Sequence, residues 1–267
     1  MYITGFYGIR FSQKGFYKIG LQLIITAVSC CSFSWILFGS FNIQHFVGAF
    51  VPVSTSFWWF MTNYLIIMLL SPIINKGLES ITKEQFGYIV KILLAIQFIS
   101  YIQLHNSAGS SFLGLFTVFL LGRFCGMYNV VLNLKKACVY FIIAWALQMA
   151  IMIMCYNWAP KYLFTTLNYN TIPLMVMSVM LFYIFYSLPS WSKREINNLL
   201  RPTLFIYLIT EGLSKPLYVY LYSLYEQNLF IFIFTFTLLI ASCLSIGYLI
   251  NLISDKIILD SATKSSI

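Results

Sequence analysis

Charged residues are scarce in this sequence. Only 9% of its 267 residues are Asp, Glu, Lys or Arg, and just seven of these are acidic. Soluble domains carry about 25% charged residues, because charge covers the surface that faces water. So few charges could not coat a chain of this length, which excludes a soluble globular protein.

Metal-binding and nucleotide-binding signatures are lacking as well. There are two histidines, His45 and His105, and none of the six cysteines belongs to a Cys-x-x-Cys pair. The cysteines lie in or at the ends of apolar runs, so we interpret them as small packing residues and predict no metal site. Two methionine-rich stretches, around Met152 and Met177, have no Cys or His beside them and indicate packing. The sequence also contains no glycine-rich phosphate loop, no Gly-x-Ser-x-Gly and no His-Glu-x-x-His.

Long apolar runs dominate what is present. Apolar residues make up 60% of the chain and the mean hydropathy is +0.85. A membrane-spanning helix needs about 20 apolar residues, and strands would leave backbone amides unpaired in hydrocarbon. We therefore predict an all-α, polytopic transmembrane helix bundle of about eight spans, forming one membrane-embedded domain over residues 1–267. The predicted spans are Ile19–Phe38, Ser56–Asn75, Tyr88–Leu104, Phe112–Tyr128, Ala137–Asn157, Thr171–Leu188, Pro202–Tyr225 and Leu229–Ile253.

The basic residues orient this bundle, because Lys and Arg are retained on the cytoplasmic side. One set of alternate connections holds fourteen of the sixteen Lys and Arg, and the other set holds only Lys161 and Lys215. This asymmetry predicts a cytoplasmic C-terminus. The asymmetry also accounts for the net charge of +9, because the basic residues orient the spans in the membrane. We therefore predict no nucleic-acid partner.

The seventh span contains two charged residues, although a charge at the centre of a spanning helix costs about 2.5–3.5 kcal/mol. Glu211 and Lys215 are four residues apart, which would place them on one helix face, and Pro216 predicts a kink. The pair is open to two interpretations. It could form the polar wall of an outward-facing cavity, or it could be a structural pair, with the alternative that the helix ends at Gly212 and Lys215 lies in solvent.

Two further polar positions are open to a functional and a structural interpretation. Arg123 lies near the inner end of its span, where it could extend to the headgroups or bind a phosphate. Asn63 shares a helix face with Trp59, four residues before it. Together with Trp58 and Tyr64, these side chains could form an interfacial aromatic belt or a sugar-binding surface.

Four segments, taken in order, resemble the type-3 membrane acyltransferases. The stretch Phe57–Leu65, continuing through Leu69–Lys76, is similar to the family's "YWFxTxYxxLYLLSPxLN". The resemblance covers essentially the whole chain. The other three segments are Thr4–Gly8, similar to "SGYxG"; Leu120–Phe124, similar to "YLLGRY"; and Thr203–Thr210, similar to "SxxxYLxH".

Members of this family are bacterial multi-span enzymes that typically move an acetyl or similar group from cytoplasmic acyl-CoA to an extracytoplasmic sugar. The resemblance therefore implies a bacterial inner-membrane protein with acyl-CoA as donor substrate, no bound cofactor, and a surface or lipid-linked glycan as acceptor. The expected partners are membrane lipid and that glycan, and homo-oligomerisation is left open. In this interpretation the donor contacts are Arg123, Arg10 and Lys14, and the acceptor contacts are Trp59, Asn63, Tyr64 and Glu211.

Two departures from the family bear on catalysis. Its first helix brings an Arg and a His thought to carry the chemistry, but this chain begins at what corresponds to the end of the second helix. The His of the last motif is replaced here by Thr210, which Glu211 follows. We therefore expect a chain that lacks the first one or two helices and is catalytically incomplete by itself, with Glu211 as the remaining candidate for a general base.

Three alternatives stay open beside the truncated enzyme. A purpose-built short paralogue would have the same residues. A lipid-linked glycan flippase would use Glu211, Lys215 and the kink at Pro216 as a transport pathway. A non-catalytic membrane partner would pack beside another acyltransferase.

Overall fold

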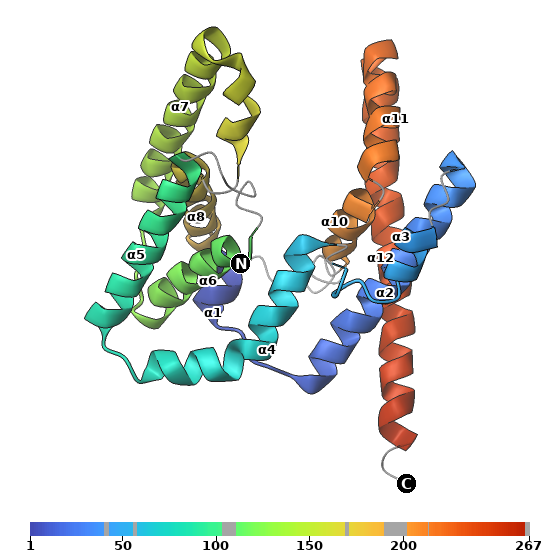
Figure 1. The fold of residues 1–267 in the computed structure, drawn as a ribbon, viewed down its shortest axis with the longest axis horizontal. Coiled ribbons are helices and arrows are strands. Elements are labelled where there is room, and N and C mark those ends of the chain that lie inside the picture. The colour runs from blue at the N-terminus through green and yellow to red at the C-terminus, as the bar shows by residue number, and fades with distance from the viewer. Residues whose placement is uncertain are drawn as a thin grey trace. The chain divides into compact units, whose positions relative to one another are not determined.

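The computed structural model of the chain describes residues 1–39, 43–55, 58–102, 111–168, 171–189, 202–212 and 214–264. Regular structure in these residues is entirely helical, which confirms the all-α prediction (Figure 1). His105 and the basic residues Lys193, Arg194 and Arg201, which entered the topology argument, lie outside the described residues. The α-helices are α1 Tyr2–Tyr7, α2 Gln13–Phe38, α3 Ile43–Gly48, α4 Trp59–Glu79, α5 Lys83–Ile102, α6 Phe112–Met127, α7 Leu134–Trp158, α8 Ile172–Tyr186, α10 Thr203–Gly212, α11 Ser214–Gln227 and α12 Leu229–Lys264, and the 3-10 turns are Pro160–Tyr162 and Phe164–Leu167.

Every predicted apolar run coincides with helical structure. The agreement is closest for α6, predicted as Phe112–Tyr128 and observed as Phe112–Met127. Three helices among the described residues are long and apolar enough to cross a membrane: Gln13–Ile36 of α2, Leu134–Trp158 of α7 and Leu229–Ile257 of α12. These three helices suggest a membrane protein.

The seventh run is described in two parts, α10 up to Gly212 and α11 from Ser214, with Pro216 in the first turn of α11. Residue 213, which joins the two parts, lies outside the described residues. The predicted kink at Pro216, the common helix face for Glu211 and Lys215, and the alternative that a helix ends at Gly212 therefore stay predictions.

The chain divides into two compact units. The first comprises Met1–Phe11 and Ile66–Ser190, and the second comprises Ser12–Leu65 and Trp191–Ile267. Helix α4 begins in the second unit and ends in the first. The single membrane-embedded domain over residues 1–267 stays a prediction, and each unit is described by itself below.

In the first unit, α1 lies against α6 with the two backbones in contact (Figure 1). A Cβ atom on Gly122 would lie 2.2 Å from the carbonyl oxygen of Tyr2, and one on Gly126 would lie 2.0 Å from that of Phe6. A Cβ atom on Gly5 would likewise lie 2.0 Å from a backbone oxygen of α6. The Gly122-x-x-x-Gly126 spacing is the one that lets helices approach closely in membranes. These glycines therefore determine where α1 can dock.

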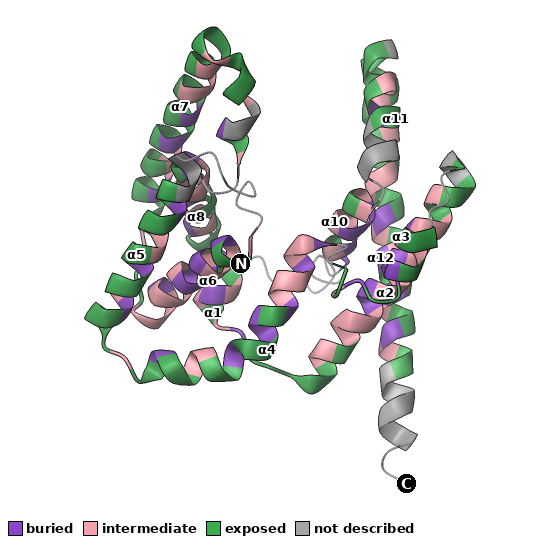
Figure 2. Cartoon of the chain, in the orientation of Figure 1, coloured by how far each residue is buried: buried purple, intermediate pink, exposed green. Residues whose placement is uncertain are grey.

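Two hydrogen bonds made by tyrosine hydroxyl groups join α8 to α1. The hydroxyl of Tyr2 donates to that of Tyr183 at 2.8 Å, and the hydroxyl of Tyr183 donates to the carbonyl of Val130 at 2.5 Å. Tyr2 and Tyr183 belong to a buried cluster that also includes Cys125, Ala137 and Met180, so the core of the first unit combines α1, α6, α7 and α8 (Figure 2).

In the second unit, polar side chains join α2 to α12. Lys18 forms an ion pair with Asp255, and one turn further along α2 the Nε2 of Gln22 donates to Asn251 Oδ1 at 2.6 Å and to Ser254 Oγ at 3.2 Å. Gln22 is only 5% exposed. Because hydrocarbon gives helices no hydrophobic reason to associate, hydrogen bonds of this kind stabilise helix pairs in membranes. This ladder therefore aligns the two candidate spans.

The close contact of Gly126 with the backbone of α1 can be tested by substitution. Replacing Gly126 by Ala places a methyl group within 2.0 Å of a backbone oxygen, so α1 must move away from α6. We expect a loss of about 1–3 kcal/mol in unfolding free energy and exposure of Cys125, which is 8% exposed in the native structure. Maleimide labelling of the detergent-purified protein, mapped by mass spectrometry, measures that exposure.

The matched control is Gly77→Ala in α4, because no atom lies within 4 Å of a Cβ atom there. This variant should leave the labelling of Cys125 unchanged. Equal labelling of Cys125 in G126A and the unmodified protein would contradict the proposed role of the contact.

Candidate functional site

Two of the segments that carry the resemblance meet in the first unit. Helix α1 ends at Tyr7 and Gly8 follows with φ of +77°, a conformation that favours glycine. A Cβ atom on Gly8 would lie 2.5 Å from Nη1 of Arg123 on α6. Gly8 therefore supplies both the turn and the space that the guanidinium of Arg123 occupies.

Arg123 is partly buried and has unused hydrogen-bonding capacity. Its Nε is buried and has no hydrogen-bond partner in the described part of the chain, and no described carboxylate forms an ion pair with it. A buried donor without a partner is unfavourable by about 1–3 kcal/mol, and a guanidinium binds phosphate oxygens through paired N–H groups. Arg123 is thus suited to bind an anion.

A third segment reaches the same turn from α4. The side-chain Nδ2 of Asn75 donates to the carbonyl of Ile9 at 2.8 Å, while its Oδ1 is buried and lacks a partner among the described residues. Asn75 ends the first motif of the resemblance, but sequence reasoning assigned it no role. Its unsatisfied acceptor and the unsatisfied donor of Arg123 belong to side chains that both lie against the Gly8–Ile9 turn, which makes this turn the candidate functional site.

The two other predicted donor contacts lie at the surface. Arg10 follows the turn and is exposed, in the first unit with Arg123. Lys14 is exposed in the first turn of α2 and belongs to the second unit. Their convergence on one ligand with Arg123 stays a prediction.

The remaining segments meet in the second unit, where the start of α4 lies against α10. The indole Nε1 of Trp58 donates to the carbonyl of Leu208 at 3.0 Å, and the rings of Phe60 and Tyr207 are 5.9 Å apart in an edge-to-face arrangement. Trp58 is 1% exposed. It is therefore a core residue and not part of an aromatic belt, because its N–H is satisfied by a helix carbonyl inside the unit.

The predicted acceptor contacts are distributed over these two helices. Trp59, Asn63 and Tyr64 are all partly buried on α4, and the amide of Asn63 makes no hydrogen bond to another described residue. Glu211 is exposed near the end of α10, so nothing in its surroundings supports a role as base. Thr210, at the position of the family's His, donates to the Ile206 carbonyl of its own helix at 2.6 Å.

Comparisons with known proteins identify no relative: no family model, no curated protein and no solved structure matches this chain.

Replacing Trp58 by Phe tests the contact between α4 and α10. The phenyl ring is smaller than the indole and has no N–H, so the hydrogen bond to Leu208 is lost and a cavity is left. We expect a loss of about 2–3 kcal/mol and a decrease in Tm of about 4–10 °C. Thermal unfolding of the protein in detergent measures the change. Trp158→Phe is the control, since Trp158 is 77% exposed. Similar decreases in both variants would show that the contact does not stabilise the unit.

Proposed function

We propose that the chain is an integral-membrane acyltransferase of the type-3 family, or the donor-binding part of one. It would transfer an acetyl or similar acyl group from acyl-CoA to a hydroxyl of an extracytoplasmic glycan in a bacterial cell envelope. One observation carries the proposal: segments from α1, α4 and α6, each singled out by the resemblance, meet at the Gly8–Ile9 turn, where Arg123 has an unpaired buried donor.

At this turn, Arg123 would bind a phosphate of the coenzyme A moiety. Its guanidinium offers several N–H donors, and a phosphate would satisfy the Nε that has no partner in the described chain. The Oδ1 of Asn75 would accept a hydrogen bond from the adenine or pantetheine part of the donor. Arg10, exposed beside the turn, would add a second positive charge at the entrance.

The reaction is a simple acyl transfer. The hydroxyl oxygen of the acceptor attacks the carbonyl carbon of the thioester, the C–S bond breaks, and coenzyme A leaves as a thiolate that takes up a proton. The proton of the hydroxyl passes to a base. No described residue has the position and burial expected of that base, which agrees with a chain that holds the donor but needs a further group for turnover.

On the acceptor side, Trp59, Asn63 and Tyr64 on α4 would form the sugar-binding surface. An amide and two aromatic side chains on one helix would match the mixed polar and apolar faces of a sugar ring.

The proposed topology has about eight spans in one membrane domain, with the C-terminus in the cytoplasm. It rests on the sorting of basic residues into alternate connections. This places the Gly8–Ile9 turn and Arg10 on the cytoplasmic face, where acyl-CoA is available.

Binding of the donor tests the function directly. We expect saturable binding of labelled acetyl-CoA to the purified protein in lipid nanodiscs. Arg123→Ala should weaken this binding by about tenfold or more, because it removes a charge-assisted hydrogen bond of about 1.5–3 kcal/mol. Arg123→Lys should weaken it less, since the charge remains but the fork geometry is lost.

Lys136→Ala provides the matched control. Lys136 is an exposed basic residue on the same proposed face, and only its backbone N–H has a partner, the N-cap Asn133. Its replacement should leave the affinity within about twofold, as expected for a screened surface charge. Absence of saturable binding, or equal weakening by R123A and K136A, would remove the enzyme assignment.

The topology makes an independent prediction. Reporter domains fused after His105 and after Lys135 should lie on opposite sides of the membrane, with the fusion after Lys135 in the cytoplasm, because one span separates the two positions. Protease protection and the activity of compartment-specific reporters measure this. Both reporters on the same side would invalidate the assignment of faces.

A further inference from the structure

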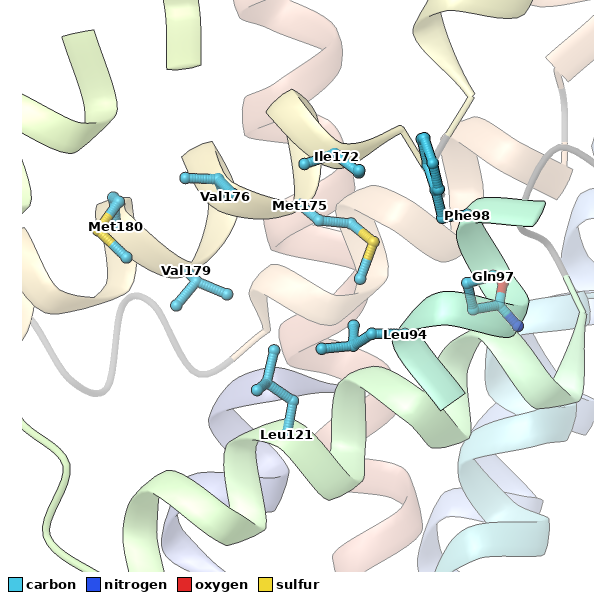
Figure 3. Close-up of a pocket in the computed structure, with 9 residues that line it drawn as sticks. All are labelled: Leu94, Gln97, Phe98, Leu121, Ile172, Met175, Val176, Val179 and Met180. Carbon is cyan, nitrogen blue, oxygen red and sulfur yellow. The ribbon is translucent and has the colours of Figure 1, made fainter. Parts of the chain in front are cut away.

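An apolar groove lies in the first unit between α5, α6 and α8, with a volume of about 290 Å³ (Figure 3). Its longest wall is one face of α8, where the lining residues recur at the three- and four-residue spacing of a helix stripe. They extend over eight residue steps, or about 12 Å, so the groove is elongated. These residues are Ile172, Met175, Val176, Val179 and Met180.

The opposite wall contains the single polar side chain of the lining. Leu94, Gln97 and Phe98 of α5 face α8, and Leu121 of α6 closes the floor. Gln97 is 6% exposed, so its amide lies largely away from solvent. The groove is therefore hydrocarbon-like along its length, with one amide at the α5 end.

The two ends of the groove differ. Phe98 and Ile172 are 41% and 46% exposed and form an open rim, and Gln97 lies beside Phe98 in the chain. At the other end, Met180 is 8% exposed and belongs to the buried cluster of the first unit. Figure 3 shows Met180 at the end of the lining away from Gln97 and Phe98. A ligand would enter at the rim and end at Met180.

The position of α8 indicates which molecules reach that rim. α8 lies along α7, one of the three helices long and apolar enough to cross a membrane (Figure 1). In the proposed membrane topology the groove would lie within the apolar layer, where the surrounding solvent is lipid hydrocarbon. An apolar cavity of a protein in water can stay empty. A groove that opens into a membrane is instead surrounded by lipid acyl chains at high concentration.

We propose that this groove binds one fatty-acyl chain of a membrane phospholipid, with the ester near Gln97 and the terminal methyl group at Met180. A cavity of about 150 Å³ accommodates benzene, so the groove has room for a chain segment of roughly ten to twelve carbons. The flexible thioethers of Met175 and Met180 suit a chain of variable shape. The amide of Gln97 would donate to the ester carbonyl. This inference does not rest on the proposed acyl transfer.

Photocrosslinking tests the proposal in the full chain. The protein is reconstituted into phosphatidylglycerol vesicles that contain a trace of phosphatidylglycerol with a diazirine near the end of one acyl chain. We expect crosslinks at 172–180 and 94–98 that saturate and are displaced by unlabelled phospholipid. Gln97→Leu should reduce this specific labelling about fivefold, through loss of one buried hydrogen bond.

A pair of variants on α8 separates the groove from the general lipid surface. Val176→Trp fills the groove and should decrease the labelling about tenfold, which corresponds to 1.4 kcal/mol. Leu181→Trp adds the same side chain to an exposed site of α8 outside the lining, and should leave the labelling unchanged.

The outcomes distinguish the possible sources of the bound acyl chain. Labelling that rises in proportion to the probe concentration, or that persists in both V176W and Q97L, would indicate ordinary contact with lipid. Either result would overturn the proposal. Displacement of the probe by a long-chain acyl-CoA but not by phospholipid would also overturn it, because the occupant would then be a soluble thioester. If V176W does not fold, saturation in the unmodified protein and the effect of Q97L decide the question.

Discussion

Helices surrounded by hydrocarbon gain little by burying apolar side chains against each other, because lipid is as apolar as they are. Their association must come from close backbone contact and from the few polar groups that find partners. Both occur in this chain. Gly122 and Gly126 let α1 touch α6 at the backbone, and Gln22 with Asn251 joins α2 to α12. With only 9% charged residues, these contacts determine the architecture of each unit.

The same contacts position the candidate site. Docking of α1 on α6 places Gly8 against Arg123, and Asn75 of α4 ties the following residue, Ile9, to the same place. The buried Nε of Arg123 and the buried Oδ1 of Asn75, both without a partner among the described residues, belong to the side chains that lie against this turn. A site for an anionic ligand can thus arise from helix packing alone.

Helix α6 separates this site from the apolar groove. Leu121 faces the groove, and Arg123, two residues later, faces α1. Residues two apart on a helix point to different faces, so one helix can serve both without mixing their ligands. In the proposed function, α6 would hold a charged donor on one side and a hydrocarbon chain on the other.

Sequence alone determined where the helices lie, because length and hydropathy are local properties. α6 was predicted as Phe112–Tyr128 and is observed as Phe112–Met127, a difference of one residue. Which side chains pair with one another was decided only by the tertiary structure. Gln22 and Asn251 are 229 residues apart, and local sequence does not reveal which polar side chains meet across such a separation. The unpaired acceptor of Asn75 and the groove beside Gln97 have the same origin, since each is formed by helices that are distant in the chain and are brought together by packing.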